Sequence, residues 1–194
     1  EHISVERDGE IILAPCDLTI HAGEKIAIIG ESGAGKTTLL NVLYGEIQPS
    51  QGRIRYQGRE LTSTQLYQAG AYILQSSHVF DGLSLEENIA LGQEIDQQRM
   101  ENILQETGLL SIKGKVPSNQ TFSGGEKQRL EIARALYHKR QFILADEVKA
   151  NLDAKNQEKI NQLLFSLPQA VVEVIHHYTK EDLKRYDKVI HLKR

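Results

Sequence analysis

The sequence predicts an α/β domain built around a mainly parallel sheet. Short apolar runs at residues 25–29, 142–145, 171–175 and 188–192 are typical of strands that are buried on both faces. Helical patterns lie between several of these runs, and such an alternation indicates a sheet covered by helices on both sides. A glycine-rich loop lies directly between the first run and the helical pattern that follows it.

Two parts of the chain depart from this alternation. Short segments at residues 3–5, 11–13 and 18–20, and a further candidate at 52–58, predict an antiparallel patch beside the main sheet. From residue 76 the chain is rich in helical patterns, which predicts a helical insertion. We therefore expect one domain over residues 1–194, in which 1–75 and 141–194 form the core with its β patch and 76–140 form a helical subdomain.

Composition limits the possible functions. Hydrophobic residues make up 40% and charged residues 25% of the 194 residues, as in an ordinary globular domain. The net charge is −3, from 23 Lys and Arg against 26 Asp and Glu, so no nucleic-acid partner is expected. The sequence contains no run of eighteen apolar residues, which is about the length that a membrane-spanning helix needs. The single cysteine, Cys16, favours a reducing compartment and a buried structural role.

The strongest local signal is a phosphate-binding loop. Residues 30–38 read G-E-S-G-A-G-K-T-T and match G-x-x-x-x-G-K-[ST] between a strand and a helix. Glycines let the backbone turn around an anion, and the N–H groups at the helix start then attract phosphate oxygens. This predicts the RecA-like core of a P-loop NTPase. Its candidate nucleotide-binding residues are Gly30, Ser32, Gly33, Ala34, Gly35, Lys36, Thr37 and Thr38.

The loop and a second strand end predict catalytic and metal-binding groups. Lys36 is expected to contact the β- and γ-phosphates, and the Thr37 hydroxyl to ligate Mg²⁺. The apolar strand at 142–145 is followed by two acids. Asp146 is placed to hold Mg²⁺, and Glu147 to orient or deprotonate an attacking water.

Residues 122–136 read F-S-G-G-E-K-Q-R-L-E-I-A-R-A-L and predict a capped helix. Ser123 fits the N-cap and Glu126 its capping-box partner. A capped core helix does not explain Gly124 and Gly125, which lower helix propensity at the first two helical positions. We interpret this glycine-flanked helix start as a second phosphate-binding surface.

These motifs closely resemble those of the ATP-binding cassette (ABC) family, and the resemblance covers nearly the whole chain in the family's order. Gln75 matches the Q-loop glutamine, and residues 150–153 match the D-loop. His176 matches the switch histidine, and the spacing to Asp187 favours it over His177.

The resemblance implies roles for these residues. Gln75 would sense Mg²⁺ and the γ-phosphate where a membrane partner docks, and His176 would contact the γ-phosphate. The signature residues Ser123, Gly124, Gly125 and Glu126 would contact ATP bound by a second domain, and Asp153 would cross-link the two sites.

The resemblance also implies an Mg-dependent ATPase. Two such domains, identical or different, would face each other head to tail with ATP between them, at the cytoplasmic face of the cell membrane. Segments 79–80 and 84–89 resemble exporter-type cassettes, which are commonly fused behind a transmembrane domain, so we expect export. Two alternatives stay open: a soluble ABC ATPase in translation or DNA maintenance, and a degenerate, nucleotide-gated regulatory cassette.

The chain departs from the family pattern at several positions. Phe122 replaces the usual Leu and Glu126 the usual Gln of the signature, and residues 148–150 read V-K-A where P-T-S is usual. Arg7 stands near the position of the aromatic residue that stacks on adenine. A guanidinium plane can stack on a base, so Arg7 is a candidate base contact.

Overall fold

The computed structural model describes residues 1–56, 58–74, 78–118 and 121–193. The chain divides into two compact units. The first, called the core unit below, comprises Glu1–Tyr72, Gln141–Glu147 and Pro168–Arg194. The second, called the helical unit, comprises Ile73–Arg140 and Val148–Leu167.

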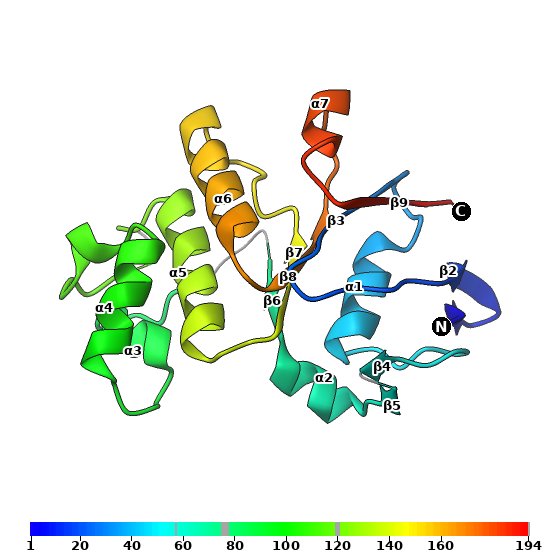
Figure 1. The fold of residues 1–194 in the computed structure, drawn as a ribbon, viewed down its shortest axis with the longest axis horizontal. Coiled ribbons are helices and arrows are strands. Elements are labelled where there is room, and N and C mark those ends of the chain that lie inside the picture. Colours follow the sequence, from blue (N-terminus) through cyan, green and yellow to red (C-terminus); the bar gives the residue numbers. More distant parts are fainter. Residues whose placement is uncertain (57, 75–77, 119–120, 194) are drawn as a thin grey trace. The chain divides into compact units, whose positions relative to one another are not determined.

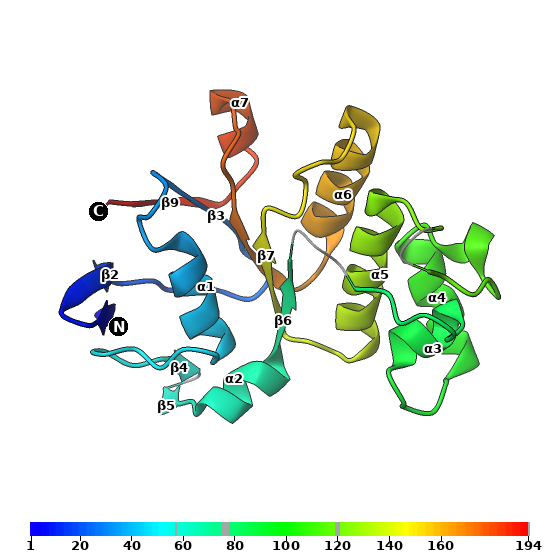
Figure 2. The same ribbon diagram turned by 180° about the vertical axis from the view of Figure 1, so that it is seen from behind.

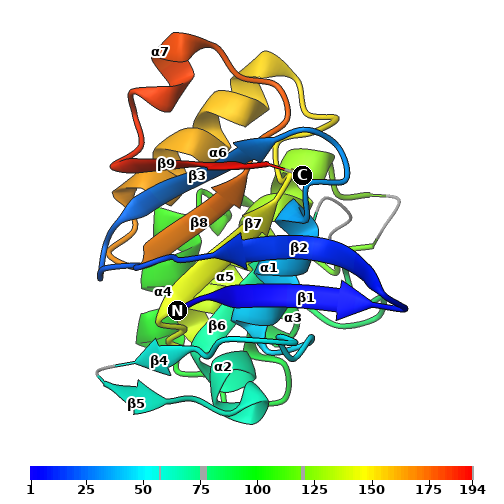
Figure 3. The same cartoon turned by 90° about the vertical axis from the view of Figure 1, so that its right-hand side faces the viewer.

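A five-stranded sheet, with the order β6-β7-β8-β3-β9, organises the core unit. Its strands are β3 (Lys25–Gly30), β6 (Gly70–Ile73), β7 (Phe142–Asp146), β8 (Ala170–Val174) and β9 (Lys188–Leu192). Strand β3 pairs in parallel with β8 and β9, and β7 pairs in parallel with β8 (Figure 3). Every residue of β8, and all of β3 except its last glycine, is buried. The expected parallel sheet is confirmed.

Helix α1 (Lys36–Tyr44) contacts β3 and β7 and fills the centre of the core unit (Figure 2). Its side chains Leu39, Leu40 and Val42 are fully buried, in one cluster with Ile26 and Ile28 of β3. The helix ends at Gly45, whose positive φ of 87° allows its N–H to bond back to two carbonyls of the last turn. The core unit also contains α2 (Ser63–Ala69) and α7 (Lys180–Leu183).

Two small antiparallel hairpins accompany the sheet. Strand β1 (Ile3–Arg7) pairs with β2 (Glu10–Cys16), and β4 (Arg55–Tyr56) pairs with β5 (Arg59–Glu60). The strand expected at residues 18–20 is wrong, and the candidate at 52–58 is reduced to β4. After β2, the Asp17 carboxylate accepts the His2 N–H at 2.7 Å in place of a ladder carbonyl, and the chain leaves the hairpin.

Cys16 is half-buried rather than buried, at the end of β2.

The helical unit is built around α5 (Gly124–Tyr137), which contacts α3 (Leu85–Ala90), α4 (Gln97–Glu106) and α6 (Ala154–Ser166) (Figure 1). A short 3₁₀ helix spans Leu110–Ile112. The core of the helical unit contains Leu85, Met100, Leu104 and Leu130, which are all fully buried. In the described part of the chain, no helix combines the length and apolar character needed to cross a membrane.

Candidate nucleotide site

Positive φ angles, and close backbone contacts at two of the three positions, explain the glycines of the phosphate loop. Gly30, Gly33 and Gly35 have φ values of +150°, +80° and +85°, which side chains disfavour. A Cβ at Gly30 would lie 2.4 Å from the Leu192 carbonyl oxygen, and one at Gly35 would lie 2.6 Å from the Ile12 carbonyl oxygen. Gly35 is the N-cap of α1 and supplies no side-chain cap. The N–H groups of the first turn therefore remain available for an anion.

Lys36 lies at the centre of this loop. Its side chain is buried, and Nζ donates to the Gly30 carbonyl at 2.9 Å and to the Glu31 carbonyl at 2.8 Å. An ammonium group carries three N–H donors, so one remains for a phosphate oxygen. Of the other candidate residues in the loop, Ala34 is buried, Thr38 is half-buried, and Ser32 and Gly33 are exposed.

The predicted metal-binding pair is brought together. Thr37 Oγ1 donates to Asp146 Oδ2 at 2.9 Å, and Asp146 is buried at the end of β7. The other carboxylate oxygen, Oδ1, is also buried and has no hydrogen-bond partner among the described residues. A hydroxyl oxygen and an unused carboxylate oxygen are hard oxygen ligands of the kind that Mg²⁺ prefers. Thr37 and Asp146 therefore fit a magnesium ion.

Tyr72 also contacts Asp146, and the sequence interpretation missed it. Its hydroxyl donates to Asp146 Oδ2 at 3.3 Å, from β6, the neighbour of β7 in the sheet. Burial, followed by the charge of Asp146, raises the pKa of Tyr72. The available signal was a tyrosine within the apolar run 71–74, but that signal alone does not reveal its partner.

Glu147 and His176 form the second contact of the core unit's site. Glu147 Oε1 lies 2.9 Å from His176 Nε2, and about a third of each side chain is exposed (36% and 35%). Glu147 has a φ of +52°, a conformation that costs energy for a non-glycine residue and clusters at functional sites. His177 makes no hydrogen bond or ion pair with Glu147 in the described structure. The arrangement pairs a carboxylate base with an imidazole.

In the helical unit, the predicted capping box of the signature helix is present. Ser123 Oγ accepts the Glu126 N–H at 3.3 Å, and Glu126 Oε2 accepts the Ser123 N–H at 2.8 Å. Burial alone would raise the pKa of Glu126, but the hydrogen bonds from Ser123 outweigh it and lower that pKa. Phe122, which replaces the usual leucine of the signature, is buried in the core of the helical unit, where either apolar side chain can pack.

The two signature glycines have a structural reason that the sequence interpretation lacked. A Cβ at Gly124 would lie 2.9 Å from Leu152 Cδ2, and one at Gly125 would lie 2.9 Å from Asn156 Oδ1. A side chain at either position would therefore have to displace the end of a neighbouring side chain, which gives both glycines a packing reason beside the predicted phosphate contact.

Asp153 is the N-cap of α6. Its Oδ1 accepts the Asn156 N–H at 3.0 Å and its Oδ2 accepts Asn156 Nδ2 at 2.6 Å. The bond from the Asn156 backbone N–H lowers the pKa of Asp153. Nearby, Val148 is buried and Lys149 donates to Asn161 Oδ1 at 2.7 Å. The unusual residues after Glu147 thus have packing and hydrogen-bond partners of their own.

Two predicted site residues remain to be placed. Gln75 lies outside the described residues. Arg7 is exposed at the end of β1, opposite Glu10 in the hairpin register. Its side chain makes no hydrogen bond or ion pair within the described structure.

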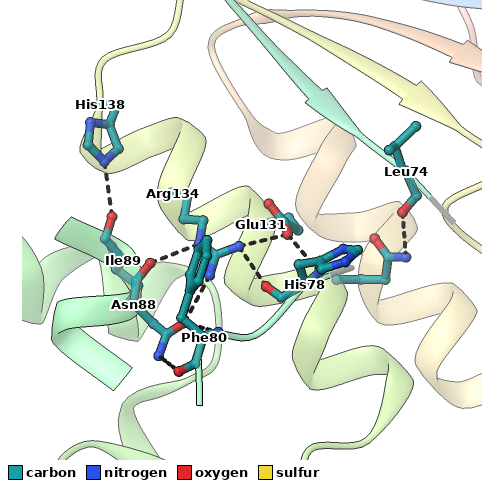
Figure 4. A network of polar contacts seen from close by, with 9 residues as sticks. Leu74, His78, Phe80, Asn88, Ile89, Glu131, Arg134 and His138 are labelled. Atoms are coloured by element: carbon teal, nitrogen blue, oxygen red, sulfur yellow. Dashed lines mark hydrogen bonds and ion pairs between the residues drawn. The ribbon is translucent and has the colours of Figure 1, made fainter. Parts of the chain in front are cut away.

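A buried polar network in the helical unit was also missed (Figure 4). Glu131 accepts the His78 N–H at 3.2 Å, and Arg134 donates to the His78 carbonyl at 2.8 Å. Arg134 also reaches the Asn88 carbonyl at 2.8 Å and pairs with Glu131 at 2.7 Å. Gln128 donates to the Leu74 carbonyl at 3.1 Å. One stripe of α5 therefore holds the described residues on either side of 75–77.

The parallel sheet, the phosphate loop and the acids that end β7 define a P-loop nucleotide-binding protein. The family model described as "ABC transporter" matches residues 13–150, and the chain therefore belongs to that family, as a nucleotide-binding domain.

Relatives support the same assignment. The putative 2-aminoethylphosphonate import ATP-binding protein PhnT of Salmonella typhimurium is 33% identical over 97% of this chain and 54% of its own length. The thiamine import ATP-binding protein ThiQ of Histophilus somni is 34% identical over 91% of this chain and 87% of its own. The lipoprotein-releasing system ATP-binding protein LolD of Idiomarina loihiensis is 35% identical over 84% and 76%. The chain thus spans about half the length of PhnT.

Solved structures share the fold. CbiO1 from Clostridium perfringens, part of the ABC transporter complex CbiONQ, aligns with a TM-score of 0.87 and 25% identity over 100% of this chain and 83% of its own. A bacterial Atm1-family ABC exporter with ATP bound gives a TM-score of 0.82 at 24% identity, over 100% of this chain and 36% of that one. The named curated relatives serve import or lipoprotein release, so export stays a prediction.

Proposed function

We propose that this chain binds and hydrolyses Mg-ATP to power a membrane transporter. The observation that carries the proposal is the geometry at the end of β7. Asp146 bonds to Thr37 of the phosphate loop, and the next residue, Glu147, contacts His176. Two successive residues at one strand end thus supply one member of the metal-binding pair, Asp146, and the candidate base, Glu147.

Each residue has a distinct task in hydrolysis. Lys36 and the free N–H groups of the loop bind the β- and γ-phosphates, and Thr37 and Asp146 hold the metal. Mg²⁺, when bound, neutralises charge on the phosphate oxygens. Glu147 accepts the proton of the attacking water, while His176 orients the Glu147 carboxylate and contacts the γ-phosphate. Gln75 is proposed as a further metal contact and γ-phosphate sensor.

We propose that two such domains close head to tail on ATP. Ser123 and Gly124 are exposed at the start of α5, where N–H groups of a helix start can meet a phosphate held by the other domain. Gly125 and Glu126 belong to the same turn, and Asp153 cross-links the two sites. In this proposal residues 1–194 act as one ABC ATPase domain, with 1–75 and 141–194 as core and 76–140 as helical subdomain.

The transporter is proposed to be an exporter whose transmembrane domain is fused upstream, with this domain at the cytoplasmic face of the cell membrane. Residues 79–80 and 84–89 support this choice. Import is the second candidate, because PhnT and ThiQ are named as import ATP-binding proteins. The complete reading frame tests the fusion. Membrane-spanning helices encoded upstream would support it, and a frame without any would contradict it.

The Lys36→Ala variant tests nucleotide binding. It removes a charge-assisted contact worth about 1.5–3 kcal/mol, so ATP affinity should fall by about 10- to 150-fold and Mg-dependent phosphate release should stop. Equilibrium titration with ATP and a phosphate-release assay measure the two effects. Lys159→Ala, an exposed lysine on α6, is the matched control. Wild-type affinity in Lys36→Ala would refute the site, and a wild-type chain that binds ATP without hydrolysing it would indicate a regulatory cassette.

A further inference from the structure

The carboxylate of Asp146 is held by two hydroxyl groups from different parts of the core unit. Oδ2 accepts Thr37 Oγ1 at 2.9 Å and Tyr72 Oη at 3.3 Å, while Oδ1 is buried without a partner in the described structure. Thr37 belongs to the phosphate-loop motif, but Tyr72 belongs to none of the motifs. We propose that Tyr72 is a positioning residue for the metal, which fixes the Asp146 carboxylate so that Oδ1 faces the ion.

The geometry gives Tyr72 a role that Thr37 cannot fill alone. Thr37 is itself a proposed metal ligand, so its hydroxyl has to serve the ion and Asp146 together. Tyr72 approaches from the neighbouring strand, and within the described residues its hydroxyl bonds only to the carboxylate oxygen that Thr37 also contacts. Groups that hydrogen-bond a ligating carboxylate orient it toward the metal, and their loss typically weakens metal affinity by about 10- to 100-fold.

The ring of Tyr72 is fixed by neighbouring aromatic residues. It packs edge-on against Tyr44, with ring centroids 5.4 Å apart, and Tyr44 packs against Tyr67 at 4.9 Å. Tyr44 is the last residue of α1, the helix that begins with Lys36 and Thr37. Helix α1 therefore carries a metal ligand at one end and the support for Tyr72 at the other.

The inference rests on the proposed function and is tested by metal binding rather than by turnover. Mn²⁺ serves as the probe, and electron paramagnetic resonance measures its dissociation constant from the complex of the full chain with ADP. Tyr72→Phe removes the hydroxyl and keeps the ring. We expect Mn²⁺ affinity to fall by about 10-fold or more, while ADP affinity in EDTA stays within about twofold of wild type.

Two further variants make the outcome specific. Asp146→Asn should lose Mn²⁺ binding almost entirely. Tyr67→Phe, at the far end of the same row of rings, removes a hydroxyl that does not bond to Asp146 and should bind Mn²⁺ like wild type. Unchanged Mn²⁺ affinity in Tyr72→Phe beside a clear loss in Asp146→Asn would overturn the inference and leave the proposed function standing. Loss of ADP binding in EDTA by Tyr72→Phe would also overturn it, because the hydroxyl would then serve the fold. A wild-type chain without nucleotide binding would refute the proposed function instead.

Discussion

At the scale of single residues, the contact between His176 and Glu147 separates two adjacent histidines. His176 Nε2 lies 2.9 Å from Glu147 Oε1, whereas His177 has no such contact in the described residues. His176→Ala should lower kcat by roughly 100-fold, a typical contribution of a group in acid–base catalysis, and leave ATP affinity nearly unchanged. His177→Ala should change kcat by less than about threefold. Steady-state kinetics and ATP titration measure both. The reverse ranking would mean that the switch histidine is assigned one residue too early.

The residues that could be predicted from sequence are those whose chemistry lies in a short motif. Lys36 and Thr37 stand at fixed places in one loop, and Asp146 and Glu147 end a plainly apolar strand. Tyr72 and Asn156 could not be found in this way. Tyr72 meets Asp146 across 74 positions of sequence, and the contact of Asn156 with Gly125 exists only after α5 and α6 pack. Such roles depend on tertiary contacts.

At the scale of elements, α5 combines a start that we propose meets a phosphate with a buried polar stripe. Arg134 and Glu131 are nearly buried, with side-chain exposures of 9% and 19%, and burial raises the pKa of Glu131. Arg134→Met would remove the guanidinium donor from the Glu131 carboxylate and from the His78 and Asn88 carbonyls, and it would leave Glu131 only the His78 N–H. Removing one partner of a buried ion pair costs about 3–5 kcal/mol. We therefore expect a loss of about 3 kcal/mol in unfolding free energy, measured by urea denaturation.

Glu131→Gln is the matched control for that loss. It keeps an oxygen that can accept both the His78 N–H and the Arg134 guanidinium, and it removes the charge that burial disfavours. We expect it to cost about 1 kcal/mol, the usual value of one hydrogen bond. Equal losses in the two variants would show that the charge of Glu131 opposite Arg134, rather than the hydrogen bonds that Gln keeps, supplies the stability of the network.

The elements themselves were predictable where one physical signal dominates. The apolar runs of β3, β7 and β8 are buried on both faces, so their composition alone indicates a parallel sheet. The expectation that residues 188–192 are buried as well is wrong, because β9 is the last strand of the sheet and exposes Val189 and His191. Residues 18–20 carry the same kind of signal, yet Leu18 and Ile20 only pack half-buried against the core. Apolar composition indicates burial, but a strand also needs a neighbour whose backbone N–H and C=O groups are free to pair. The His2 N–H is not free, because it donates to the Asp17 carboxylate.

At the scale of the whole molecule, the proposed cycle couples hydrolysis to the association of two domains. Glu147→Gln keeps the shape of the side chain and an oxygen for His176, but it removes the basic carboxylate. General-base catalysis typically contributes about 10²- to 10⁴-fold, so turnover should fall by that order. ATP binding should survive, because Lys36, Thr37 and Asp146 are unchanged. Loss of a negative charge near the triphosphate should also favour closure.

We therefore expect the isolated Glu147→Gln chain to be a dimer with Mg-ATP and a monomer with Mg-ADP, as measured by size-exclusion chromatography with light scattering. Adding Lys36→Ala to Glu147→Gln should abolish the dimer, because that chain no longer holds the nucleotide. A dimer that persists with ADP or in the double variant would form through a surface unrelated to ATP. A monomer from a Glu147→Gln chain shown to bind ATP would contradict trapping of the closed pair. Wild-type turnover in Glu147→Gln would refute Glu147 as the base, and the unusual residues Val148 and Lys149 beside it would then be the first place to look for a different water-activating arrangement.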